Sequence, residues 1–132
     1  MKNIYISCPV VGRTEENIRR SREVMRKYAE LMLGEECRVI NENPVSEYTI
    51  NSDVSDGPIV WCCDCSHAIK ALSSHIRQMA DADVFVGITS DAYVTCSCER
   101  DVAHRMCMET ILIDFDGCTC FDDVNKRRIV EY

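Results

Sequence analysis

The sequence lacks any long apolar run, and it lacks the features of a secretion signal. No stretch of about 18 apolar residues occurs in the chain, which excludes a membrane-spanning helix. The first residues, MKNIYISCPV, show no basic region followed by an apolar stretch and a small-residue cleavage site. We therefore expect a soluble, cytoplasmic protein with no membrane partner.

Positive charge is also scarce. Lys and Arg number 15 against 22 Asp and Glu, so the net charge is −7. Proteins that bind the nucleic-acid backbone need clustered Lys and Arg, so we expect no nucleic-acid partner. A small anionic ligand is still compatible with this charge, because one arginine and a few backbone amides can hold it.

Internal repeats, low-complexity segments and a domain linker are absent from the sequence as well. The chain has 132 residues, and 46% of them are hydrophobic, which is enough for a core of ordinary size. The sequence therefore predicts a single domain over residues 1–132.

Cysteine, by contrast, is abundant. Ten cysteines occur, and six of them form the C-x-C pairs of residues 63–65, 96–98 and 118–120. Without a secretion signal, reduced thiols are expected rather than disulfides. Structural zinc sites use wider C-x(2–4)-C spacing, so we expect no metal and interpret the cysteines as small hydrophobic residues in packed positions. A cysteine-ligated metal protein is the alternative, and bound zinc or iron would establish it.

Strands and helices alternate along the chain, which predicts an α/β fold with a parallel sheet. Helical spacing predicts an amphipathic helix over 15–33, capped by Thr14 and Gly34, and a polar segment at 41–57 predicts a long loop. A loop of that length is usually a functional cover or disordered. The other predicted helices are 58–80, 97–108 and a short one near 122–126; the predicted strands are 3–6, 38–40, 83–88, 110–113 and one near 128–130.

Three polar segments are expected at one edge of this sheet. The segments 7–13, 41–57 and 89–98 each follow a predicted strand and lead into the next element. Ligands of open parallel sheets bind beyond the carboxyl ends of the strands, where helix N-termini also present free amides. We therefore expect a binding crevice at this edge.

Glu99 is the most interesting residue at that edge. It lies in TCSCERDVAH, where a helix is predicted to begin. A glutamate in a first turn commonly does no more than complement the helix dipole. The functional interpretation is a carboxylate that acts as a nucleophile or stabilises an oxocarbenium ion.

The order of these motifs resembles the nucleoside 2-deoxyribosyltransferase-like superfamily, which includes the deoxynucleoside 5′-monophosphate N-glycosidases and a related bacterial and phage domain of unknown function. The likeness covers residues 3 to about 114. It rests on the strand IYIS with a Gly-Arg loop, the strand ADADVFVGI, the following glutamate and the strand TILID. It implies a flavodoxin/Rossmann-like three-layer sandwich with a mostly parallel five-stranded sheet. It also implies hydrolysis of a 2′-deoxynucleoside or its 5′-monophosphate, or transfer of the deoxyribosyl group.

The resemblance further implies individual roles. Glu99 would be the nucleophile, Tyr5 would orient it, and no metal or organic cofactor would be needed. The ligand would be a nucleoside or nucleotide, and the protein would form a homodimer or a higher homo-oligomer. Contacts to sugar or phosphate would come from Ser7, Cys8, Gly12, Arg13, Asp91 and Ser97.

The sequence departs from the family pattern in three places, one of which is the charged pair Arg100-Asp101, where the family is usually apolar or has glycine. The segment Thr95–Glu99 has no glycine, although the family's loop before the nucleophile is Gly- or Ser-rich. His75 stands where the family has an aspartate that donates a proton to the leaving base, and histidine can transfer a proton near neutral pH. The alternative is therefore a nucleotide-binding or nucleotide-signal-binding protein that does not turn its ligand over.

Overall fold

A computed structural model of the chain describes residues 1–10, 13–41, 49–51, 59–61, 65–114 and 129–131. The elements follow the order β1 (Lys2–Ile6), α1 (Glu15–Leu33), β2 (Cys37–Val39), β3 (Thr49–Asn51), β4 (Ile59–Trp61), α2 (Cys65–Met79), β5 (Val84–Ile88), α3 (Val94–Arg105), β6 (Glu109–Ile113) and β7 (Ile129–Glu131). Strands and helices alternate through most of the chain, as the sequence predicts.

The main sheet has the strand order β2-β1-β5-β6-β7. The first four of these strands run parallel, and β7 lies antiparallel to β6 at the edge. The parallel part therefore holds four strands, and the antiparallel β7 is the fifth strand of the sheet. This arrangement is consistent with a Rossmann-like fold. Because β2 and β5 lie on opposite sides of β1, the topological switch point is between β1 and β5.

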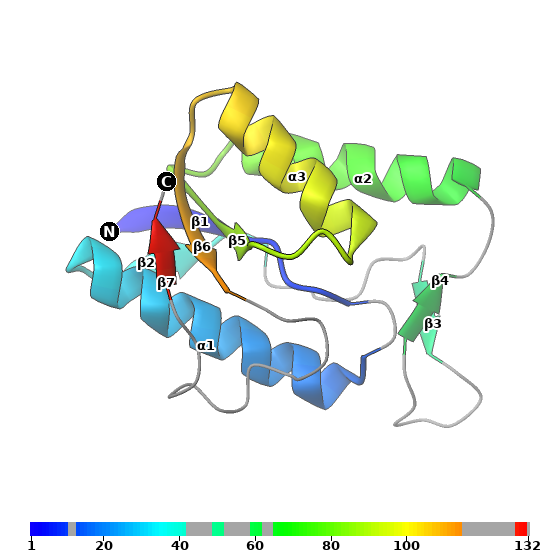
Figure 1. Ribbon diagram of the computed structural model, residues 1–132, viewed down its shortest axis with the longest axis horizontal. Helices are drawn as coiled ribbons and strands as arrows, with labels where there is room; N and C mark the ends of the chain where they lie inside the picture. The colour runs from blue at the N-terminus through cyan, green and yellow to red at the C-terminus, as the bar shows by residue number, and fades with distance from the viewer. Residues whose placement is uncertain (11–12, 42–48, 52–58, 62–64, 115–128, 132) are drawn as a thin grey trace.

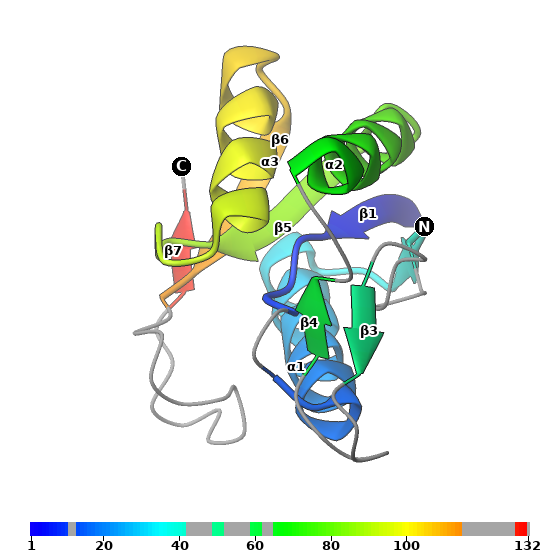
Figure 2. The same cartoon turned by 90° about the vertical axis from the view of Figure 1, so that its right-hand side faces the viewer.

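Helices cover both faces of the sheet (Figures 1 and 2). α1 lies against one face, and α2 and α3 lie against the other. Side chains of a strand alternate between faces, so Ile4 and Ile6 pack with α1 residues, whereas Tyr5 packs with Met79 of α2 and Ala103 of α3. Each large side chain buried in this way contributes about 1.5–3 kcal/mol. None of the helices in the described ranges is long and apolar enough to cross a membrane.

The caps of α1 are those that the sequence predicts. Thr14 is extended, and its side-chain oxygen accepts a hydrogen bond of 3.2 Å from the backbone N–H of Asn17. Gly34 adopts a left-handed conformation with φ of 71°, and its N–H donates to the Glu30 carbonyl. Both signals are local, which explains why the bounds 15–33 are confirmed.

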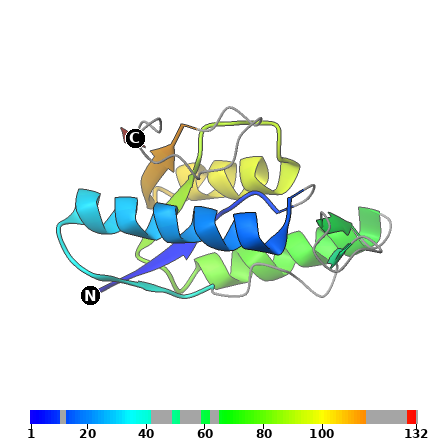
Figure 3. The same cartoon turned by 90° about the horizontal axis from the view of Figure 1, so that it is seen from below.

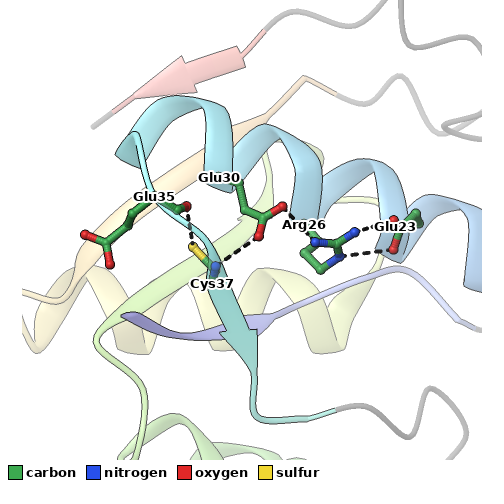
Figure 4. A network of polar contacts seen from close by, with 5 residues as sticks. All are labelled: Glu23, Arg26, Glu30, Glu35 and Cys37. Atoms are coloured by element: carbon green, nitrogen blue, oxygen red, sulfur yellow. Dashed lines mark hydrogen bonds and ion pairs between the residues drawn. The ribbon is translucent and has the colours of Figure 1, made fainter. Parts of the chain in front are cut away.

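Charged residues of α1 also connect this helix to β2 (Figure 4). Arg26 pairs with Glu23 and, at 2.7 Å, with Glu30. The other oxygen of Glu30 accepts a hydrogen bond of 3.0 Å from the backbone N–H of Cys37, at the start of β2. The network therefore fixes the edge strand to the helix that covers it.

The predicted long loop at 41–57 is wrong in part, because it contains β3. β3 pairs antiparallel with β4 as a separate two-stranded sheet. This sheet lies beside the start of α2 (Figures 1 and 3). Three-residue strands give almost no period-2 signal, so a polar neighbourhood conceals them. The predicted helix start at Pro58 is also wrong, because β4 intervenes and α2 begins at Cys65.

The predicted helix 97–108 is shifted by three residues at each end, since α3 spans Val94–Arg105. Its N-cap, Tyr93, makes no side-chain capping bond, so no residue type marks the start. Beyond its end, Cys107 has a φ of 58°, a conformation that sequence reasoning assigns to glycine. The predicted helix near 122–126 lies outside the described residues, and the strand predicted near 128–130 corresponds to β7.

Candidate functional site

The centre of the site is the carboxylate of Glu99. It lies in the second turn of α3 rather than in the first, so the helix-dipole interpretation loses its basis. Glu99 is only 3% exposed. A buried carboxylate is costly unless hydrogen bonds satisfy it, and here the donors come from the carboxyl end of β1.

Tyr5 is the first of these donors. It faces the α2 and α3 layer from β1, and its hydroxyl lies 3.2 Å from Oε1 and 3.1 Å from Oε2 of Glu99. The ring stacks on Phe85 with centroids 6.0 Å apart. Burial raises the pKa of the Tyr5 hydroxyl far above its usual value, and the nearby Glu99 charge raises it further. Tyr5 is therefore a neutral hydroxyl that donates to the carboxylate.

Ser7 is the second donor and follows directly after β1. Its Oγ donates to Oε1 of Glu99 at 2.9 Å, and the residue is buried. Its backbone N–H donates to the Val86 carbonyl of β5 at 2.8 Å, which fixes the position of Ser7 at the switch point. The thiol of Cys96 is buried one turn before Glu99. Burial, followed by the Glu99 charge, holds the pKa of this thiol well above its ordinary value.

His75 reaches the same carboxylate from α2. Its Nδ1 lies 3.5 Å from Oε2 of Glu99, within ion-pair range. The geometry is not that of a hydrogen bond, and within the described part of the chain this buried nitrogen has no hydrogen-bond partner. The side chain is 27% exposed, so the imidazole extends from the buried carboxylate toward the surface.

The structure thus brings together the residues with the predicted catalytic roles. Tyr5, Ser7 and His75 surround Glu99, although the four come from β1, the segment after it, α2 and α3. The cluster lies at the carboxyl end of β1, beside the β1–β5 switch point, where ligands of such sheets bind. The two helices that supply His75 and Glu99 pack side by side on this face (Figure 2).

The other predicted residues of the first loop lie in a different set of contacts. Arg13 is buried, and its guanidinium donates to the Pro9 carbonyl at 3.0 Å and to Oγ of Ser21 at 2.6 Å. The Cys8 thiol lies 3.7 Å from the same guanidinium, and burial raises the pKa of this thiol. These contacts join the loop to α1. Gly12 lies outside the described residues.

Asp91 and Ser97 contact each other at the start of α3. Oγ of Ser97 donates to Oδ1 of Asp91 at 3.2 Å, and Arg100 forms an ion pair with the same oxygen. The Arg100 guanidinium also donates to the carbonyls of residues 88, 89 and 90. Hydrogen bonds from Arg100 and then Ser97 lower the pKa of Asp91. Arg100, which departs from the family pattern, therefore holds the β5–α3 loop.

Sequence reasoning misses two residues near the carboxyl end of β1, Asn41 and Arg22. The Asn41 carboxamide bonds to both backbone polar groups of Ile6, and Arg22 of α1 donates to the Ile6 and Asn41 carbonyls. Asn41 is the first residue of the predicted loop, and Arg22 is one of several charged residues on α1, so neither stands out in the sequence. No spacing in the sequence relates them to β1.

Metal-ligating residues do not gather in the described part of the chain. Over the described ranges, no group of three or more His, Cys, Asp or Glu side chains is placed to hold a metal ion. The described cysteines, at positions 8, 37, 96, 98 and 107, are all free thiols.

No family model matches the sequence. No curated protein matches it either.

Proposed function

We propose that the protein cleaves the N-glycosidic bond of a 2′-deoxynucleoside or its 5′-monophosphate, with Glu99 as the nucleophile. The observation that carries this proposal is the buried Glu99 carboxylate, oriented by the hydroxyls of Tyr5 and Ser7 at the carboxyl end of β1. A structural glutamate needs no such position, whereas a glycosyl-transferring carboxylate needs both fixed orientation and a ligand-binding edge.

The two carboxylate oxygens differ in their surroundings. Oε1 accepts the Ser7 hydrogen bond, whereas Oε2 faces His75, which makes no hydrogen bond to it. Tyr5 has a single proton and can donate to only one oxygen at a time. Oε2 therefore keeps a free lone pair, and we assign the attack to this atom.

The reaction then has two steps. Oε2 forms a bond to the anomeric carbon while the carbon–nitrogen bond breaks, and the departing base takes a proton from His75. Nδ1 of His75 faces Glu99, so Nε2 is the nitrogen that donates this proton. In the second step water, or a second base, attacks the anomeric carbon, the ester bond breaks and Glu99 is released. Water gives hydrolysis, a base gives transfer, and His75 recovers its proton from the attacking group.

A protein that binds a nucleotide without cleaving it is the second candidate. The 3% exposure of Glu99 favours it, because an attacking carboxylate must meet the sugar. Catalysis therefore requires the His75 side of the site to open when the ligand enters.

Base release by wild type and Glu99→Gln tests the proposal. Both proteins are incubated with each deoxynucleoside and each 5′-monophosphate, and free base is measured by chromatography. Glu99→Gln keeps the side-chain shape but cannot attack, so release is expected to fall by at least about 100-fold. Asp101→Asn is the matched control, because Asp101 is an exposed carboxylate of the same helix, paired with Arg105.

The outcomes separate the two candidates. Release by wild type and Asp101→Asn, but not by Glu99→Gln, supports the enzyme. Absence of release from every substrate, together with thermal stabilisation by one of them, overturns the enzyme and supports the binding protein. Equal release by all three proteins would place the chemistry elsewhere than at Glu99.

A further inference from the structure

The end of β1 has polar backbone groups that the main sheet does not pair. The last backbone bond from the β2 side runs from the N–H of Ile40 to the Ile4 carbonyl, at 3.0 Å. The next residue of β1 that faces this side is Ile6, because Ser7 bonds to β5 on the other side. Ile6 is buried, so an unpaired N–H or carbonyl there would be costly.

The side chain of Asn41 supplies both missing bonds. The N–H of Ile6 donates to Oδ1 of Asn41 at 2.9 Å, and Nδ2 of Asn41 donates to the Ile6 carbonyl at 2.7 Å. A carboxamide has a donor and an acceptor side by side, so it matches the N–H and C=O of one strand residue. Asn41 thus continues the pairing of β1 by one residue after β2 has ended at Val39.

Arg22 supports this arrangement from α1. Its guanidinium donates to the Ile6 carbonyl at 3.4 Å and also to the carbonyl of Asn41. The three residues therefore join the carboxyl end of β1, the segment after β2 and the middle of α1. No described residue other than Arg22 bonds to the Asn41 backbone carbonyl.

We infer that Asn41, supported by Arg22, is a positioning residue for the Glu99 site. Ile6 lies between the two residues that donate to Glu99, Tyr5 before it and Ser7 after it. Fixing both backbone groups of Ile6 therefore fixes the direction of the Tyr5 and Ser7 side chains toward the carboxylate. Asn41 acts through these residues and touches neither Glu99 nor the reacting atoms.

The expected effect of Asn41 on the reaction rate comes from the position it gives to the donors of Glu99, and this inference rests on the proposed function. A displacement of about 1 Å in a reacting group can cost about 100-fold in rate. Asn41→Ala is therefore expected to lower kcat by about 10- to 100-fold while KM changes by less than about threefold. Asn41→Asp keeps the acceptor for the Ile6 N–H but puts a charged acceptor oxygen against the Ile6 carbonyl in place of the donor, so its kcat is also expected below that of wild type.

The matched control is Asp83→Ala, which removes a similar bond at the opposite end of the same strand. The backbone N–H of Asn3 donates to Oδ2 of Asp83 at 2.8 Å, far along β1 from Glu99. If the loss of any side-chain bond to β1 lowered kcat, Asn41→Ala and Asp83→Ala would lower it alike. We expect Asp83→Ala to keep the kcat of wild type, whatever its effect on thermal stability.

A second measurement does not depend on activity. The Tyr5 hydroxyl proton is buried and donated to a carboxylate, so it is expected as a slowly exchanging proton NMR signal, absent in Tyr5→Phe. Asn41→Ala, or Asn41→Asp should the alanine variant not fold, is expected to shift or broaden this signal. Asp83→Ala is expected to leave it unchanged.

These readouts keep the two proposals apart. If wild type releases no base, the proposed function fails, and the NMR signal alone decides the role of Asn41. A Tyr5 signal unchanged in both Asn41 variants overturns the inference. An active Asn41→Ala with the kcat of Asp83→Ala overturns it as well.

Discussion

The hydroxyl of Tyr5 lies within hydrogen-bond distance of both carboxylate oxygens of Glu99, although the two residues are 94 positions apart in the sequence. β1 carries the first and α3 the second, and both are buried. A neutral hydroxyl beside a buried carboxylate stabilises the charged oxygens without introducing a second charge. The pair is therefore the part of the site whose energetics can be measured most directly.

The Tyr5–Glu99 bond gives the first prediction. Tyr5→Phe removes the hydroxyl but keeps the ring that stacks on Phe85, so packing is preserved. The carboxylate loses a donor, and we expect the free energy of unfolding to fall by about 1–3 kcal/mol. Urea denaturation measures this loss. The same change made in Glu99→Gln is expected to cost at least about 0.5 kcal/mol less, and strictly additive costs would contradict a direct bond.

The carboxylate of Asp91 gives a prediction on pH. Its pKa is lowered from 3.8 by the hydrogen bond from Arg100 and then by that from Ser97. A lowered folded-state pKa stabilises the protein above pH 3.8, and this stabilisation is lost as the pH falls through the lower folded-state value. The stability difference between wild type and Asp91→Asn is therefore expected to shrink below about pH 4.

Urea denaturation at a series of acidic pH values measures this difference. The effect is expected to be small, because the Asp91 side chain is 76% exposed and solvent screens the ion pair. Glu23→Gln is compared with Asp91→Asn in the same measurement, because a hydrogen bond from Arg26 lowers the pKa of Glu23 as Arg100 lowers that of Asp91. Equal acid slopes for wild type and Asp91→Asn would show that the Arg100 contact does not persist in solution.

Thiol reactivity gives a third prediction. Cys107 is exposed, whereas Cys8 and Cys96 are buried and have raised pKa values because burial disfavours the thiolate. Iodoacetamide at about pH 8 is therefore expected to label Cys107 long before the other two. Mass spectrometry of peptides measures the order of labelling. Early labelling of Cys96 in the folded protein would mean that the Glu99 site opens readily.

Two glycines form a matched pair for the fourth prediction. In Gly34→Ala the new methyl group meets no atom within 4 Å, so the cost comes only from the positive φ of 71° and is expected at about 1 kcal/mol. In Gly87→Ala the methyl group would lie 2.5 Å from the ring of Phe85, which must then move. We expect about 1–3 kcal/mol of destabilisation there.

The two glycine variants should differ in the site as well as in stability. Phe85 supports the Tyr5 ring, so Gly87→Ala is expected to alter the Tyr5 hydroxyl signal in proton NMR. Gly34 lies at the far end of α1, and its variant is expected to leave that signal unchanged. Identical spectra for both variants would argue that Phe85 does not position Tyr5.

Local signals explain which elements are predictable. α1 has a capping threonine, a terminal glycine and helical spacing between them, and its bounds are confirmed. β5 is a continuous apolar run buried along its whole length, as expected at a sheet centre. The start of α3 has no capping side chain, and its end has a cysteine in a left-handed conformation, so its bounds are misplaced.

The site is predictable only in part. Sequence order and resemblance suggest Glu99, Tyr5 and His75, and the structure places these three side chains together. The structure adds a bond from Ser7 to Glu99 that the sequence does not predict, and the ligand contact of Ser7 stays a prediction. The guanidinium of Arg13 bonds to Pro9 and Ser21, because a buried guanidinium must satisfy its donors, and the predicted ligand contact of Arg13 stays a prediction.

By itself, the sequence determined the alternation of strands and helices, the caps of α1 and the polar character of the carboxyl edge. These features depend on neighbouring residues, whose spacing and side-chain chemistry are visible along the chain. Only the tertiary structure decided that Ser7 donates to Glu99 and that Asn41 completes the pairing of Ile6. Those contacts depend on the order of strands in the sheet and on where β2 ends, and neither is encoded in the spacing of nearby residues.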